Sequence, residues 1–260
     1  VDAPLATDWL SGSSYTANGT AGDATSIVST VEVRVDANGD GDFLDGGIED
    51  WAPASGTATW TSVVSLAGLG EGSRTLDVRA TDAAGNEMTA SRSFGVDQTN
   101  PTTDITSPAD TGALFTVSGT ASDANELTGV VVTESKDGAT ATEVLNTTLT
   151  GKTDTWSVVD MPSGGVATGV YEYTVTVEDA AGKTYQTSAT TTIDISAPSV
   201  AIGSPGANDQ LLGSAFSPAG TASDVGDSGV LSVEYRIDVD NDDAFSGTGF
   251  EAWVAATGTT

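Results

Sequence analysis

The chain contains no cysteine and no histidine among its 260 residues, and only 8 lysines and arginines. A thiol nucleophile, a Ser-His-Asp triad, a structural zinc site and a thiolate iron–sulfur cluster all need residue types that are absent. The few basic residues stand against 37 aspartates and glutamates, which gives a formal net charge of −29. A surface of that charge repels phosphate backbones, so we expect no nucleic-acid partner. The sequence also lacks a run of roughly 20 apolar residues, which a membrane-spanning helix needs.

What the chain does contain is an internal repeat of about 100 residues. The segment Gly19–Asp23 recurs as Gly119–Asp123 and again as Gly220–Asp224. An Asp-Ala-Ala-Gly sequence begins at Asp82 and returns at Asp179. The repeat predicts three units, which span residues 1–95, 96–192 and 193–260.

Each boundary has an apolar residue and an aspartate, followed shortly by a proline. The pattern is present at Val96-Asp97 before Pro101 and at Ile193-Asp194 before Pro198, and the chain start Val1–Pro4 resembles it. We therefore expect unit one to begin at the chain start. The residues given for unit three stop before the counterpart of the stretch from Trp60 to Phe94, so we expect this unit to be incomplete.

Within the units, apolar residues alternate with polar ones, as in 31–35, 76–80 and 171–177. Alternation with a period of two is typical of antiparallel strands that bury one face, and clusters of Gly, Asn, Asp, Ser and Pro between the runs indicate turns. No segment has the pattern of a capped amphipathic helix. About seven short strands in a unit of this size predict an all-β protein built of β-sandwich domains in a linear array.

Trp60 and Trp156 occupy the same place in two such strands, 96 positions apart. A single tryptophan at one strand position of each unit is typical of a core residue. The alternative is a carbohydrate-stacking platform, which needs several exposed aromatic residues on one face. We therefore expect both indoles to be buried.

The order of these features resembles the bacterial Ig-like (Big-type) tandem repeats. The features are the Gly-Thr-Ala-Ser-Asp segment, the alternating strand, the tryptophan strand, the Asp-Ala-Ala-Gly turn and the closing Asp…Pro linker. The resemblance covers two complete units and part of a third. It implies an Ig-like sandwich array from a large prokaryotic cell-surface protein of adhesin or surface-layer type. Such modules serve many purposes, so the resemblance does not select one function.

An acidic loop follows the alternating strand in unit one and is repeated in unit three. In a tight loop, Ca²⁺ is bound by oxygen-bearing side chains at alternate positions. Clustered carboxylates also repel one another unless a cation lies among them. A bidentate carboxylate would have to come from Asp45, Glu49 or Asp50 in unit one and from Glu251 in unit three, and we expect the aligned Glu49 and Glu251. The expected calcium ligands are Asp36, Asn38, Asp40, Asp42, Asp45 and Glu49 in unit one, and Asp238, Asp240, Asp242 and Glu251 in unit three. The alternative is a solvated acidic hairpin, and for unit two, with 134–138 at this place, we expect no ion.

A second set of aspartates flanks the unit boundaries. Linker, turn and strand-end carboxylates that converge where two sandwiches meet would hold a cation and stiffen the array. The candidate ligands at the junctions are Asp82, Asp97, Asp123, Asp179, Asp194 and Asp224. The alternative is that these residues only form hydrogen bonds within turns.

Together these features favour a non-enzymatic structural or adhesive segment of an extracellular, cell-surface protein, stiffened by Ca²⁺. A stalk, a filament and a surface-layer array all stay open, and the alternative is a set of accessory modules of a secreted or cell-wall-bound hydrolase. Expected partners are neighbouring repeats or copies of the same protein, cell-surface glycans, or a neighbouring chain's strand that completes unit three. Asn18 and Asn146 lie in Asn-x-Thr sequons, which accept glycans only in a suitable host.

Overall fold

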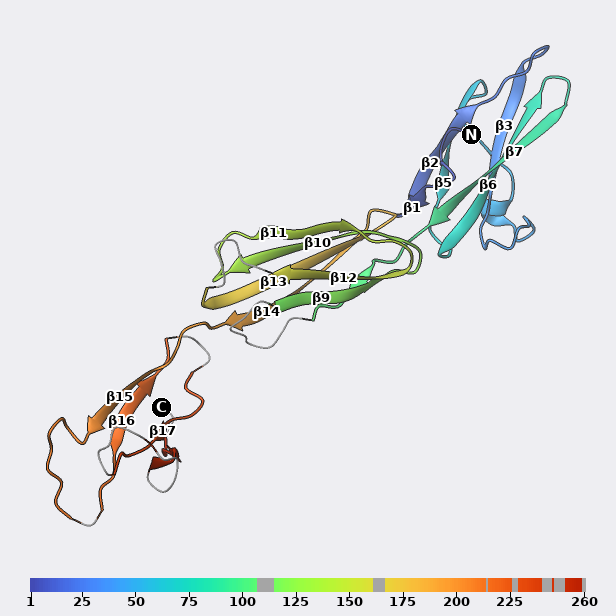
Figure 1. Ribbon diagram of the computed structural model, residues 1–260. Coiled ribbons are helices and arrows are strands. Elements are labelled where there is room, and N and C mark those ends of the chain that lie inside the picture. Colours follow the sequence, from blue (N-terminus) through green and yellow to red (C-terminus); the bar gives the residue numbers. More distant parts are fainter. Residues whose placement is uncertain are drawn as a thin grey trace.

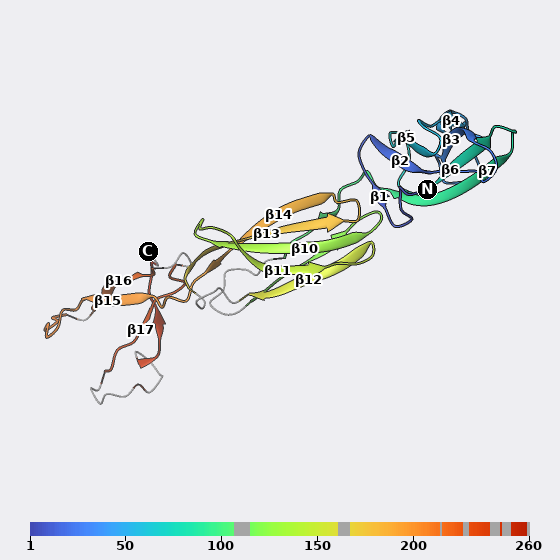
Figure 2. The ribbon, with the colours of Figure 1, turned by 90° about the horizontal axis from the view of Figure 1, so that it is seen from above.

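The computed structural model describes residues 1–106, 115–160, 167–213, 215–225, 229–239, 245 and 251–258. In these ranges the chain forms β-strands, with a short 3₁₀ helix η1 (Gly47–Glu49) in unit one. The strands are grouped in three successive units (Figures 1 and 2). The expected all-β sandwich architecture is confirmed. No helix in these ranges is long and apolar enough to cross a membrane.

Unit one is a sandwich of two sheets. The larger sheet has the strand order β1-β7-β6-β3-β4, and the smaller sheet pairs β2 with β5. The long strand β6 lies antiparallel between β3 and β7. The strands are β1 (Trp9–Leu10), β2 (Ser14–Thr20), β3 (Val28–Asp36), β4 (Ala52–Pro53), β5 (Thr59–Ser65), β6 (Gly72–Asp82) and β7 (Glu87–Val96).

Unit two repeats this arrangement. A sheet of order β11-β10-β13-β14 faces a sheet of order β12-β9-β8. The strands are β8 (Thr102–Thr103), β9 (Phe115–Ser122), β10 (Leu127–Lys136), β11 (Thr142–Thr148), β12 (Thr153–Asp160), β13 (Gly169–Asp179) and β14 (Thr184–Ile193).

The apolar residues of the alternating strands fill the space between the two sheets of each unit. In unit one Val31, Val33 and Val35 of β3 face Trp60 of β5 across one buried cluster. The indoles of Trp60 and Trp156 are only 1% and 3% exposed. The prediction that both tryptophans are core residues is therefore confirmed.

Unit three is described by two separate strand pairs. The strand β15 (Ser199–Ser204) pairs with β16 (Ala219–Ser223), and β17 (Glu234–Tyr235) pairs with β18 (Val254–Ala255). The two buried apolar clusters found in the described ranges belong to units one and two. Unit three thus has paired strands without a packed core among its described residues.

The chain start differs from the expectation. Ala3 forms an antiparallel bridge with Asn18, and in unit three Ser204 pairs with Ala219, which holds the same place in its strand. Ala3 therefore corresponds to Ser204, a residue well beyond the linker. The prediction that residues 1–4 repeat the linker is therefore wrong. An aspartate close to a proline also occurs where the first residues of unit one pair with the strand that contains Asn18, so this short pattern does not identify a linker. Asp2 is consequently not a counterpart of the linker aspartates.

Candidate metal centre

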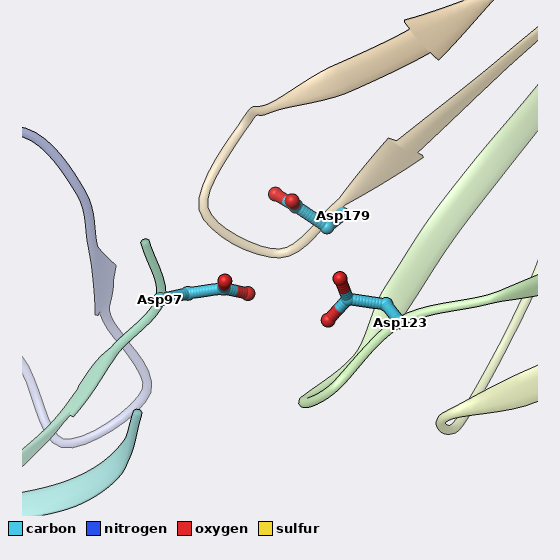
Figure 3. A group of neighbouring side chains, drawn as sticks. All are labelled: Asp97, Asp123 and Asp179. Atoms are coloured by element: carbon cyan, nitrogen blue, oxygen red, sulfur yellow. The ribbon is translucent and has the colours of Figure 1, made fainter. Parts of the chain in front are cut away.

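Three aspartates converge where unit one meets unit two (Figure 3). Asp97 directly follows β7, Asp123 directly follows β9, and Asp179 is the last residue of β13. One carboxylate oxygen of each lies within 4.8 Å of a carboxylate oxygen of each of the others. Of the six aspartates expected at junctions, the structure brings these three together.

The three carboxylates share one hydrogen-bonding arrangement. In each, Oδ1 accepts backbone N–H bonds from residues two or four positions further along the chain, while Oδ2 is buried and has no hydrogen-bond partner among the described residues. The donors to Oδ1 are Thr99 for Asp97 (3.2 Å), Asn125 for Asp123 (2.7 Å), and Ala181 and Lys183 for Asp179 (2.9 and 2.8 Å). The turn hydrogen bonds, which were the alternative to ion binding, therefore occupy one oxygen of each carboxylate and leave the other unsatisfied.

Burial makes this cluster unfavourable as three bare anions. Asp97 and Asp179 are 0% and 1% exposed. Burial raises the pKa of Asp97 above its usual range. The Asn125 side chain lowers it in part, and the charges of Asp123, Asp179 and Glu71 raise it further. Burial also raises the pKa of Asp179, and the charge of Asp123 adds to this effect. Each shift means that the ionised carboxylate is less favourable at this place than in an ordinary exposed aspartate.

The donor set fits a hard divalent cation. Ca²⁺ binds oxygen ligands at about 2.3–2.6 Å, so two ligands on opposite sides of the ion are roughly 5 Å apart. The separation of at most 4.8 Å between the oxygens of Asp97, Asp123 and Asp179 lies within that span. The three carboxylate oxygens therefore have a spacing that is compatible with ligands of one such ion.

The opposite end of unit one shows what the same turn does without a linker carboxylate. Asp82 is the counterpart of Asp179 and lies at the far end of β6 from the junction. Its Oδ2 accepts bonds from the Ser26 hydroxyl (3.1 Å) and the Asn86 side-chain amide (2.9 Å). These bonds, with that of the Asn86 side chain largest, lower the pKa of Asp82. Its carboxylate is satisfied within unit one, and its place at the far end of β6 keeps it apart from Asp97.

Two polar contacts that sequence reasoning missed also hold the junction. The Asn125 side-chain amide donates to Glu71 (3.0 Å), and Lys183 Nζ donates to the carbonyl oxygen of Gln98 (3.0 Å). Glu71 in turn accepts the backbone N–H of Gln98 (2.9 Å). No sequence signal marks these residues, because one contact joins unit one to unit two and the other joins unit two to the linker, through residues that the repeat does not preserve.

The second junction has a different arrangement. Asp194 accepts the backbone N–H of Ser196 (2.8 Å) and a longer bond from the Thr168 hydroxyl (3.5 Å). Asp224 is half-buried in unit three. Within the described ranges, neither belongs to a group of three converging carboxylates. A cation at this junction stays a prediction.

The acidic loop of unit one is organised around two buried carboxylates. Asp36 and Glu49 are 3% and 1% exposed. Asp36 accepts the N–H groups of Gly39 (2.7 Å) and Gly41 (3.0 Å). Glu49 accepts those of residues 37 (2.9 Å) and 45 (2.8 Å). The alignment that selected Glu49 thus picked the residue that closes the loop.

The other expected ligands of this loop are exposed but near one another. The Asn38 side chain donates to Asp40 (2.9 Å) and to Asp45 (2.6 Å), and Asp42 lies in the same loop. The charge of Glu49, followed by desolvation and the charges of Asp40, Asp42 and Asp36, raises the pKa of Asp45. The loop therefore concentrates negative charge, although the three-carboxylate spacing of the junction is not found here.

A guanidinium stack fixes the loop on the sheet and was also missed from sequence. Arg34 lies 3.8 Å from the ring centre of Phe43 and 4.4 Å from that of Trp51. Unit three repeats this stack: Arg236 lies 3.6 Å from the ring of Phe245 and 4.4 Å from that of Trp253. The signal was present as an arginine, a phenylalanine and a tryptophan at equal spacing in both units. Contacts of this kind contribute about 0.5–2 kcal/mol.

The remaining loop residues are described only in part. Glu251 is 7% exposed and Asp238 is half-buried. Asp240 and Asp242 lie outside the described residues. At the corresponding place in unit two, Lys136 Nζ forms an ion pair with Asp137.

The buried aspartates predict how metal-free protein responds to pH. Because their folded pKa values lie above the ordinary value of 3.8, the stability that their protonated forms provide is complete below that pH and is lost as pH rises through the folded values. The thermal midpoint of metal-free protein should therefore fall more steeply as the pH rises above 3.8 than that of an Asp97→Asn variant. The lowered pKa of Asp82 gives stability that is lost as pH falls. The thermal midpoint of the matched Asp82→Asn variant should therefore fall more steeply with rising pH than that of the wild type. If the thermal midpoint depended on pH equally in the wild type and in Asp97→Asn, the carboxylates would not be buried and mutually repelling in the folded protein.

Comparison with known proteins gives structural likeness only. No family model and no curated protein matches the chain. A tetra-tandem repeat in the extending region of a large adhesion protein is similar over 82% of this chain and 59% of that chain, with 20% identity and a TM-score of 0.36. A structure from a 1.5-MDa bacterial ice-binding adhesin is similar over 74% of this chain and 63% of that one, with 22% identity and a TM-score of 0.38. Dimeric latent PorU from Porphyromonas gingivalis is similar over 72% and 19%, with 13% identity and a TM-score of 0.27. The chain thus spans less than two thirds of the length of each of these structures.

Proposed function

We propose that this chain is a non-enzymatic structural segment of an extracellular prokaryotic surface protein, in which Ca²⁺ holds successive β-sandwich units in a fixed orientation. The observation that carries this proposal is the buried convergence of Asp97, Asp123 and Asp179, each with an unsatisfied oxygen. The ion would link two units, since Asp97 directly follows β7, the last strand of the first sandwich, whereas Asp123 and Asp179 follow or end strands of the second sandwich. Binding of the ion would therefore fix the orientation of one unit relative to the next.

The chemistry of the junction supports a mechanical role. Without a cation, three buried carboxylates repel one another and favour separation of the units. With a cation, the same carboxylates attract a common centre, while the Asn125–Glu71 and Lys183–Gln98 contacts add direct polar links. The junction is then rigid in calcium and loose without it.

The acidic loops are proposed as further calcium sites of the same segment. In unit one, the ligands would be the buried Asp36 and Glu49 with exposed carboxylates of the same loop. The repeated Arg34 and Arg236 stacks support a similar loop in unit three. Bound calcium would also reduce the charge of −29, which favours lateral approach of copies of the chain.

Distance measurements between units test the mechanical proposal. The chain has no cysteine, so cysteines placed at Met88 and Val159, which are 75% and 68% exposed, carry one spin label on each unit. We expect a narrow distance distribution in calcium and a broad one in chelator. The Asp97→Asn variant should give the broad distribution in both conditions. Equal widths for wild-type protein with and without calcium would refute a calcium-dependent stiffening.

A further inference from the structure

All four polar groups of Gln98 are bonded to residues far from it in the sequence. Its side-chain Oε1 accepts the backbone N–H of Gly12 (3.2 Å), and its Nε2 donates to the carbonyl oxygen of Gly12 (2.9 Å). Its backbone N–H donates to Glu71 (2.9 Å), and its carbonyl oxygen accepts a bond from Lys183 Nζ (3.0 Å). Gly12 and Glu71 lie in loops of unit one, whereas Lys183 lies in unit two. Three of the four polar groups therefore tie Gln98 to unit one.

Gln98 directly follows Asp97, a candidate ligand of the junction ion. We propose that Gln98 is a positioning residue for this ion, which holds the Asp97 carboxylate in place on unit one before the ion binds. This inference rests on the proposed function, since it concerns the same ion. Groups that orient a metal ligand commonly change the metal affinity by about 10–100-fold when they are replaced.

The chain before Asp97 is fixed to unit one as well. Leu10 of β1 pairs with Val96 of β7, and the carbonyl oxygen of Leu10 accepts the backbone N–H of Asp97 (2.9 Å). Asp97 thus lies between a strand pair on one side and the bonds of Gln98 to Gly12 on the other. Contacts with unit one therefore set the place of Asp97 without the help of an ion.

The flexible part of the linker begins only after Gln98. Thr99 and Asn100 are exposed, whereas the following Pro101 is buried and leads directly into β8 of unit two. Because the ring of a proline fixes its φ angle, most of the rotational freedom between the units lies in Thr99 and Asn100. Asp97 is then on one side of this hinge, and the two aspartates of unit two are on the other. An ion that joins them closes the hinge, and its affinity is higher when the ligand on unit one is already oriented.

The second junction shows that the glutamine clamp is not a general part of the linker. The residue after Asp194 is Ile195, whose side chain cannot form hydrogen bonds and is 52% exposed. The backbone bond is kept, since the N–H of Ile195 donates to the Thr168 hydroxyl (3.2 Å) where that of Gln98 donates to Glu71. The side-chain clamp therefore accompanies the junction at which three carboxylates converge.

Hydrogen exchange of the metal-free chain tests the positioning before any ion is added. In chelator, we expect the backbone amides of Asp97 and Gln98 to exchange slowly and that of Asn100 to exchange rapidly. A Gln98→Met variant keeps the length of the side chain but none of its hydrogen bonds. The amide of residue 98 should exchange about tenfold faster in this variant, because the two bonds to Gly12 are lost. Amides at 97 and 98 that exchange in chelator as fast as that of Asn100 would overturn the proposal.

Calorimetric titration of calcium into the full chain separates positioning from a purely structural role. Gln98→Met should bind as many ions as the wild type, but the junction ion about 10–100-fold more weakly. The junction ion is identified by comparison with a double variant, Asp97→Asn with Asp179→Asn, in which Gln98→Met should change nothing further. The matched control is Gln186→Met, which removes a glutamine of β14 that donates to the Thr176 hydroxyl (3.1 Å) within unit two. This control should bind calcium as the wild type does.

The outcomes distinguish this inference from the proposed function. Equal affinity for the junction ion in the wild type and in Gln98→Met overturns the positioning role and leaves the calcium site in place. A lower thermal midpoint of Gln98→Met in chelator, with unchanged calcium affinity, shows that Gln98 only stabilises unit one and also overturns it. A wild type that binds no more ions than the double variant overturns both the calcium site and the role of Gln98.

Discussion

The Asp97→Asn variant is expected to be less stable than wild-type protein in calcium and more stable in chelator. In calcium, the variant loses one charged ligand of an ion shared by two units. At a free calcium concentration 100-fold above the dissociation constant, binding stabilises the wild type by about 2.7 kcal/mol, or roughly 10–20 °C in the midpoint of a unit of this size. In chelator, the variant removes one of three buried repelling charges, while an asparagine side chain can still accept the bond from Thr99. Thermal unfolding of both proteins in calcium and in chelator measures this change in the order of their stabilities.

The Asp82→Asn variant is the matched control for this experiment. Asp82 occupies the same turn as Asp179 but is satisfied by Ser26 and Asn86 within unit one. Its substitution should leave the calcium-dependent shift at the junction unchanged. A wild-type chain whose midpoint is the same in calcium and in chelator, or an Asp97→Asn variant that keeps the full shift, would contradict calcium binding at this place.

Replacement of Trp156 by alanine is expected to lower the free energy of unfolding of unit two by about 3–5 kcal/mol. The indole is 3% exposed, lies against Gly119, and donates a hydrogen bond from Nε1 to the Thr103 hydroxyl (3.0 Å). Its removal leaves a large cavity between the sheets and takes one hydrogen bond from the Thr103 hydroxyl, which keeps its bonds to the carbonyl oxygens of Asp104 and Thr120. Denaturant unfolding followed by tyrosine fluorescence or circular dichroism gives the value.

Val159 provides the control on the same strand. It lies three positions further along β12 and is 68% exposed, so Val159→Ala should change stability by no more than about 0.5 kcal/mol. The same pair of substitutions in unit one, Trp60→Ala and Val63→Ala, should show the same contrast, since Val63 is 73% exposed. A cost below about 1 kcal/mol for Trp156→Ala would show that the indole does not hold the sandwich together.

The fold could be predicted from the sequence because its signals are local and repeated. Alternation along 31–35 and 171–177 fixes which face of a strand is buried, and the recurrence of Trp60 as Trp156 identifies the opposing sheet. The prediction for the chain start was wrong because it used a short local similarity around a proline. Such a similarity does not specify which strand the segment pairs with.

The candidate metal centre could be predicted only in part. Its carboxylates were among the expected junction residues because they recur at turn and linker positions. Which of the six aspartates converge depends on geometry that a repeat does not reveal. Asp82 accepts a bond from Ser26, whereas Asp179 lies near Asp97, which directly follows the last strand of the first sandwich. The supporting contact between Glu71 and Asn125 joins residues 54 positions apart in different units, and no local pattern predicts it.

The central claim is that one calcium ion is held between unit one and unit two. Calorimetric titration of calcium into metal-free wild-type protein and into a double variant, Asp97→Asn with Asp179→Asn, counts the ions directly. The wild type should bind one more ion per chain than the double variant, while the acidic loops contribute equally to both. An identical number of bound ions in the two proteins would contradict the claim.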